Sequence, residues 1–185
     1  MKNIPLYDVR HIEDLRDMLK QSTELYGDLP LFYYKKVRGG DYEYHTFNEY
    51  NKAVQAMGTG LSHLCGLGSR IAILAETRYE WYISYLATTN GTGIVVPLDK
   101  ELPADEVASC LNRAEVNCII YSSSKQKVLD DIKDQIPGVK YFVSMDKTDK
   151  EGVEYFYDIL NNGQELLDSP GSLQILLWEG FQTAS

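Results

Sequence analysis

The side chains best suited to chemistry lie in three short polar segments, each directly after an apolar stretch. They are Glu76 and Arg78 in the first segment, Asp99 in the second, and Ser122, Ser123 and Ser124 in the third. A carboxylate and a guanidinium group can bind a polar ligand, and Asp99 could orient one. Hydroxyls and free amides at the start of a helix can hold an anion. These segments are therefore the candidate ligand loops.

Each candidate also has an ordinary structural explanation. Glu76 and Arg78 are only two residues apart and fit a solvated loop pair, which is the commoner use of such residues. Asp99 fits a polar turn that leads to a helix beginning at Pro103. The serines fit an N-cap, which is the more frequent reason for serine at that place. Both interpretations remain open for all three segments.

The sequence lacks the familiar catalytic and nucleotide-binding motifs. It contains no GxxxxGK[ST], no GxGxxG between a strand and a helix, and no GxSxG. The three histidines and three cysteines show no ligand-like spacing, so we expect no metal site. No residue is assigned as catalytic from the sequence.

The elements that must position these loops follow an alternating pattern. Short apolar stretches typical of buried strands alternate with amphipathic stretches typical of helices. The predicted strands are 70–74, 93–96, 118–121 and 141–144, and the predicted helices are 79–89, 103–114 and 125–136. This order predicts an α/β fold with a doubly wound, mostly parallel sheet and flanking helices.

The N-terminal part predicts a helix, a small β-hairpin and a second helix. The first helix is expected over 12–26, and the hairpin strands over 31–37 and 42–45. Thr46 and Glu49 have the spacing of a capping box at the start of the second helix. Gly58 and Gly60 lie inside that helix, where glycine costs about 1 kcal/mol relative to alanine. We therefore expect another element, a sheet, to pack very close to the helix there.

The C-terminal part is less regular. A polar loop is expected over 145–153, a helix over 155–167 interrupted at Asn161-Asn162-Gly163, and a final strand over 173–178. We expect one domain over 1–185, with a loop-rich connection over 145–172. Residues 173–185 are expected to be a truncated or altered strand and phosphate-loop region.

Composition and charge exclude several classes of function. The net charge of −9, from 18 basic and 27 acidic residues, argues against nucleic-acid binding. No apolar run is long enough for a transmembrane segment, and the N-terminus lacks the apolar core of a signal peptide. The expected location is cytoplasmic.

Several segments together resemble the N-terminal subdomain of the AMP-forming acyl-CoA synthetases, in the adenylate-forming superfamily. The first three are Tyr44-His45-Thr46-Phe47-Asn48-Glu49-Tyr50, residues 71–81 (IAILAETRYEW) and residues 89–99 (TNGTGIVVPLD). Glu101-Leu102-Pro103 and residues 118–124 (CIIYSSS) continue the match. The style of these motifs is most similar to that of the long-chain fatty-acid–CoA ligases.

The resemblance implies a two-step reaction in the complete enzyme. A carboxylic acid reacts with Mg-ATP to give an acyl-adenylate, and coenzyme A then displaces AMP. The family's Gly/Ser/Thr-rich phosphate loop would follow Ile175, but this chain has Trp178, Glu179 and Phe181 there. ATP, Mg and coenzyme A are thus implied for the complete family enzyme, and no cofactor is assigned to this chain.

The primary hypothesis is therefore an acyl-CoA synthetase fragment that is inactive alone. The alternative is a non-catalytic α/β interaction or dimerisation module, a homo-oligomer formed through exposed apolar surface. Its candidate surface is the hairpin with Tyr33, Tyr34, Tyr42 and Tyr44. A third hypothesis is a mononucleotide binder that uses the loops at Glu76 and Ser122.

Overall fold

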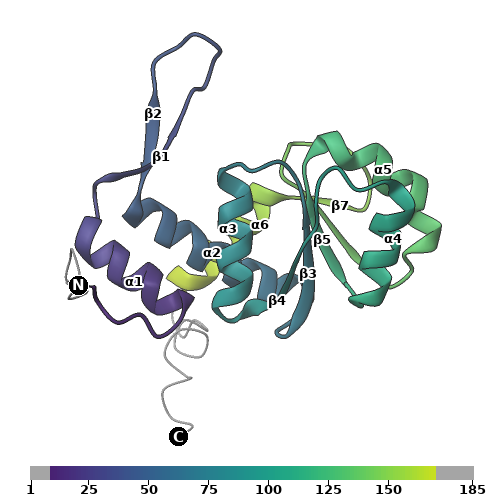
Figure 1. The fold of residues 1–185 in the computed structure, drawn as a ribbon, viewed down its shortest axis with the longest axis horizontal. Helices are drawn as coiled ribbons and strands as arrows, with labels where there is room; N and C mark the ends of the chain where they lie inside the picture. The colour runs from purple at the N-terminus through teal and green to yellow at the C-terminus, as the bar shows by residue number, and fades with distance from the viewer. Residues whose placement is uncertain (1–8, 170–185) are drawn as a thin grey trace, which may run out of the picture.

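A five-stranded parallel sheet forms the centre of the structure, a computed structural model that describes residues 9–169 (Figure 1). The strand order is β4-β3-β5-β6-β7. The strands are β3 (Ser69–Leu74), β4 (Gly93–Pro97), β5 (Cys118–Tyr121), β6 (Tyr141–Ser144) and β7 (Val153–Tyr155). The first four confirm the predicted strands. The three-residue strand β7 was missed, because it begins at the end of the stretch expected to be a polar loop.

Helices cover both faces of this sheet, as the doubly wound prediction requires. Side chains alternate along β3, so that Ile71 and Ile73 join one buried cluster while Ala72 and Leu74 join the other. The first cluster includes residues of α2 (Phe47–Cys65), α3 (Tyr79–Ala87) and α6 (Phe156–Asp168). The second includes residues of α4 (Ala104–Arg113) and α5 (Gln126–Ile132). Figure 1 shows these two helical layers on opposite sides of the strands.

The N-terminal helix, hairpin and capping box are confirmed. They form α1 (Leu15–Tyr26), β1 (Pro30–Tyr34) and the antiparallel β2 (Glu43–Thr46) before α2. Helix α1 begins three residues later than predicted, because the Asp14 side chain caps it by accepting from the Asp17 amide at 2.8 Å. At the start of α2, the Glu49 amide donates to Thr46 Oγ1 at 3.1 Å, and the Thr46 amide donates to Glu49 Oε2 at 2.9 Å. This reciprocal pair fixes where the helix begins.

Helix α6 corrects two predictions. It runs without a break through Asn161-Asn162-Gly163, so the predicted interruption is wrong. The element packed close to Gly60 of α2 is this helix, so the predicted sheet contact is wrong at that glycine. The Gly58 carbonyl instead accepts from the Thr92 hydroxyl at 3.1 Å. A Cβ added at Gly60 would overlap the carbonyl oxygen of Ile159, and one added at Gly163 would overlap that of Ala56. Both glycines therefore permit a close helix crossing.

Short irregular turns make two of the observed helices differ from the predicted ones. Helix α3 passes into a π-helical turn, Thr88–Thr92, and the predicted helix 125–136 is divided into α5 and two 3₁₀ turns, Ser123–Lys125 and Lys133–Gln135. Because β7 and α6 occupy 153–168, the connection expected to be loop-rich over 145–172 contains a strand and a helix. The prediction for 173–185 falls outside the described residues. Within residues 9–169, no helix combines the length and the apolar character needed to cross a membrane.

The close crossing of α2 and α6 predicts a large effect of a single methyl group. Replacing Gly163 with alanine would force the new Cβ onto the Ala56 carbonyl and within 2.7 Å of the Gly60 nitrogen. We expect Gly163→Ala to lower the free energy of unfolding by about 3 kcal/mol, measured by urea denaturation. Gly138→Ala is the matched control, since its Cβ would meet only Val116 O at an ordinary 3.6 Å. Equal stability of the two variants would contradict this account.

Candidate functional site

The carboxyl ends of β3 and β5 mark the place where the chain changes direction across the sheet. From β3 the chain first adds β4 on one side, and it then crosses to place β5 on the other side. Ligands of open α/β sheets collect in the crevice at such a switch point. Two of the three predicted ligand loops begin there, after Leu74 and after Tyr121.

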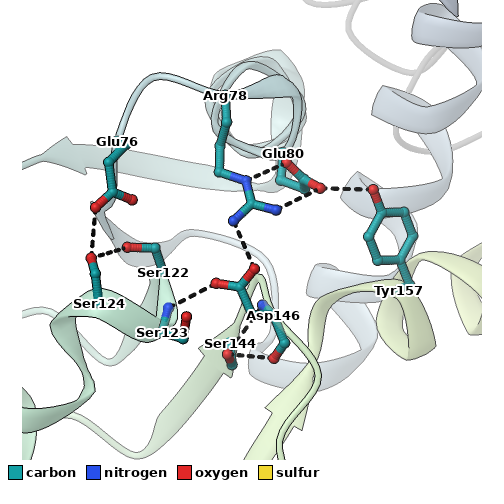
Figure 2. Close-up of polar contacts among 9 residues, drawn as sticks. All are labelled: Glu76, Arg78, Glu80, Ser122, Ser123, Ser124, Ser144, Asp146 and Tyr157. Carbon is teal, nitrogen blue, oxygen red and sulfur yellow. Dashed lines mark hydrogen bonds and ion pairs between the residues drawn. The ribbon is translucent and has the colours of Figure 1, made fainter. Parts of the chain in front are cut away.

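Glu76 is in direct contact with the third segment through Ser124 (Figure 2). Ser124 Oγ donates to Glu76 Oε1 at 2.6 Å, across 48 positions of sequence. The hydroxyls of Ser122 and Ser124 are 2.8 Å apart, and Ser122 is the donor because Ser124 gives its proton to the carboxylate. The sheet therefore brings together the first and third candidate loops.

These hydroxyls stabilise the charged form of Glu76. The bond from Ser124 is the largest cause and Ser122 the next, and together they lower the pKa of Glu76 to about 2. Because the folded pKa lies below the ordinary value of 4.5, the resulting stability is present above about pH 4.5. It is lost as the pH falls toward 2.

Arg78 makes a second set of contacts beside the first. Its Nε and Nη2 donate to the two oxygens of Glu80 at 2.7 and 3.1 Å, and its Nη1 donates to Asp146 Oδ1 at 2.8 Å. The Glu80 side chain is only 9% exposed. Tyr157 of α6 donates its hydroxyl to Glu80 Oε1 at 2.8 Å. A nearly buried carboxylate is thus fully paired, as its loss of hydration requires.

Asp146 joins this second set to the serine loop. Its Oδ2 accepts from the Ser123 amide at 2.8 Å, and its own amide donates to Ser144 Oγ at 3.2 Å. Burial alone would raise the pKa of Asp146, but the Ser123 amide and the Arg78 guanidinium outweigh it and lower the pKa. Loops after β3, β5 and β6 are consequently fastened to one another (Figure 2).

The chemistry of this arrangement differs from that of an anion site. The donors that could have received a phosphate already hold the chain's own carboxylates, Glu76 and Asp146. Arg78 pairs with two of the three carboxylates, Glu80 and Asp146, whereas Glu76 accepts from Ser124 and is attracted by Lys125. Three carboxylates therefore face two cations. The bonds among these groups fasten the loops to one another. Within residues 9–169, no three His, Cys, Asp or Glu side chains are grouped so as to hold a metal ion.

Two sequence interpretations change in detail. Asp99 lies in a separate exposed turn, where its Oδ1 accepts from the Glu101 amide at 2.9 Å. Ser122 occupies the N-cap position of the 3₁₀ turn, but its hydroxyl makes no capping bond and pairs with Ser124 instead. The N-cap interpretation therefore holds for the position of Ser122 and is wrong for its side chain.

Sequence reasoning missed four residues of the cluster: Glu80, Ser144, Asp146 and Tyr157. Asp146 follows the predicted strand 141–144 by two residues, so the strand-end rule that found Glu76 applied to it as well. Glu80 and Tyr157 lie on separate helices, 77 residues apart, and no local pattern connects them.

The fold defines the class of protein. A solved structure of the anthranilate CoA ligase AuaEII with anthranoyl-AMP superimposes with a TM-score of 0.72 at 18% identity, covering 86% of this chain and 29% of that one. A putative long-chain-fatty-acid CoA ligase from Rhodopseudomonas palustris CGA009 gives a TM-score of 0.69 at 21% identity, covering 80% of this chain and 36% of that one. The fold is therefore that of adenylate-forming enzymes.

The family follows from the sequence comparison. The profile described as AMP-binding enzyme matches residues 19–170, and this chain belongs to that family. Long-chain-fatty-acid–CoA ligase 5 of Rattus norvegicus is 25% identical over 181 residues, covering 89% of this chain and 26% of that protein. Long-chain-fatty-acid–CoA ligase of Thermus thermophilus is 26% identical over 141 residues, covering 75% and 26%. The chain spans about a quarter of the length of these curated relatives.

The pairing of Arg78 predicts a stability effect. Replacing Arg78 with methionine leaves Glu80 and Asp146 without their cation, and we expect a loss of about 2 kcal/mol in the free energy of unfolding. This is below the value for a fully buried pair because the Arg78 side chain is 34% exposed. Urea denaturation measures it. Arg113→Met is the control, because Arg113 is exposed in the last turn of α4, and the expected change is within about 0.5 kcal/mol. Equal losses in both variants would contradict the pairing.

The serine contacts predict a specific titration change. Ser124→Ala removes the bond that contributes most to the low pKa of Glu76, so that pKa should rise toward its ordinary range. NMR titration of the Glu76 side-chain carboxyl carbon measures it directly. Ser123→Ala is the control, because Ser123 contacts Asp146 and should leave the pKa of Glu76 unchanged. An unaltered pKa of Glu76 in Ser124→Ala would refute the assignment.

Proposed function

We propose that residues 1–185 form the N-terminal scaffold of a fatty-acid–CoA ligase and that this chain alone does not form an acyl-adenylate. The family membership and the names of the curated relatives support a ligase of fatty acids. In the complete enzyme, ATP and Mg would activate the acid and coenzyme A would accept the acyl group.

The absence of acyl-adenylate formation is inferred from the polar cluster at the switch point, whose donors and carboxylates are paired with one another. The Ser124 hydroxyl donates to Glu76, and the Ser123 amide donates to Asp146. The Arg78 guanidinium donates to two carboxylates, Glu80 and Asp146. A triphosphate does not fit among these groups, since it would meet an excess of negative charge. The sequence supports the same conclusion, because Glu179 stands where the family's phosphate loop is expected.

Pyrophosphate release tests this proposal. The purified chain, incubated with hexadecanoate, ATP and Mg, is expected to release no pyrophosphate above the rate without fatty acid. The Thermus thermophilus ligase, assayed alongside, shows that the reagents are active. Fatty-acid-dependent pyrophosphate release by the 185-residue chain would contradict the proposal.

The alternative function is a non-catalytic interaction module. The specific observation in its favour is the exposure of Tyr33, Tyr42 and Tyr44 on the hairpin. Light scattering over a wide concentration range distinguishes a homo-oligomer from a monomer, and a constant monomer mass would remove the self-association form of this alternative.

A further inference from the structure

The β1–β2 hairpin extends away from the body of the molecule and carries tyrosines that the fold does not use (Figure 1). Tyr33, Tyr42 and Tyr44 are 62%, 66% and 50% exposed. Tyr33 pairs with Tyr44 across the two strands, and its ring centroid lies 5.9 Å from that of Tyr44 and 6.5 Å from that of Tyr42. The three rings therefore form one outward patch, which we call the tyrosine patch.

The other face of the hairpin anchors it to the body. The Phe32 ring packs at 5.0 to 5.3 Å from the rings of Tyr50, Tyr79 and Tyr82. Phe32 and Tyr33 alternate along β1, so the anchoring face and the tyrosine patch point in opposite directions. Because Phe32 packs against the body, the alternation along β1 directs the tyrosine patch toward the outside.

The loop at the end of the hairpin is cationic, in contrast to the rest of the chain. Residues 33–44 contain Lys35, Lys36 and Arg38 against Asp41 and Glu43, whereas the whole chain has a net charge of −9. Lys36 pairs with Glu43 at 2.7 Å, and Lys35 Nζ lies 4.4 Å from the centre of the Tyr42 ring. Val37 lies between these cations and is 66% exposed. An exposed aliphatic side chain thus lies between two basic residues, Lys36 and Arg38, in the sequence of the loop.

We propose that this hairpin binds the surface of a bilayer containing anionic lipids. Tyrosine favours the boundary between headgroups and acyl chains, and Lys and Arg are attracted to anionic headgroups. Val37 would enter the acyl boundary between the cations. The acidic body is repelled by the same surface, which orients the molecule with the hairpin toward it.

Co-sedimentation with lipid vesicles tests the proposal. The chain is expected to bind vesicles of phosphatidylcholine mixed with phosphatidylglycerol, to bind pure phosphatidylcholine weakly, and to dissociate as salt rises. Each basic residue near an anionic surface contributes about fivefold in affinity, so Lys35→Gln with Arg38→Gln should weaken binding about 25-fold. That variant retains the Lys36–Glu43 pair. Val37→Ser should weaken binding roughly tenfold.

The matched control removes two exposed lysines from the body, Lys127→Gln with Lys133→Gln, and should leave binding unchanged. Circular dichroism establishes that each variant is folded. Equal binding of both double variants, or no preference for anionic vesicles, would overturn the proposal. The proposal would also be overturned if the chain bound no vesicles and a hairpin variant converted a dimer of the chain to a monomer. The assay needs no adenylation, so its result is independent of the proposed ligase function.

Discussion

The close crossing of α2 and α6 fixes how these two helices lie on one face of the sheet. Two glycines, Gly60 and Gly163, leave no side chain between the helices, so backbone lies directly against backbone. Helix α6 follows β7 and returns across the sheet to reach this crossing. The crossing places the first turn of α6 beside α3, where Tyr157 meets Glu80.

The polar cluster is the electrostatic consequence of that packing. Glu80 is nearly buried, and a buried carboxylate is stable only when its oxygens are paired. Tyr157 and Arg78 supply those partners, and Arg78 then extends the network to Asp146 and the serine loop. A crossing of two helices on one face of the sheet is thereby connected to the loops at its carboxyl edge. In those loops the Ser123 amide and the Ser124 hydroxyl donate to carboxylates of the same chain.

Much of this fold could be predicted from local patterns. The four apolar strands, the hairpin and the capping box at Thr46 and Glu49 each follow from a short stretch of sequence. Gly163 was misinterpreted as a helix break, because a glycine that permits close packing and one that ends a helix look the same in sequence. Strand β7 was missed because three residues carry too weak a pattern. The meeting of Glu76 with Ser124 follows from the strand-end rule, whereas the partnership of Glu80 and Tyr157 depends on tertiary packing alone.

At the switch point, the chain's own carboxylates Glu76 and Asp146 occupy the donors of the serine loop. The most direct test is an NMR titration of the ¹⁵N-labelled chain with Mg-ATP, following the amides of Ser122, Ser123, Ser124 and Asp146. The account predicts that these amide signals keep their positions throughout the titration. Saturable shifts confined to these amides would show that the loops bind nucleotide phosphate, and they would contradict the account.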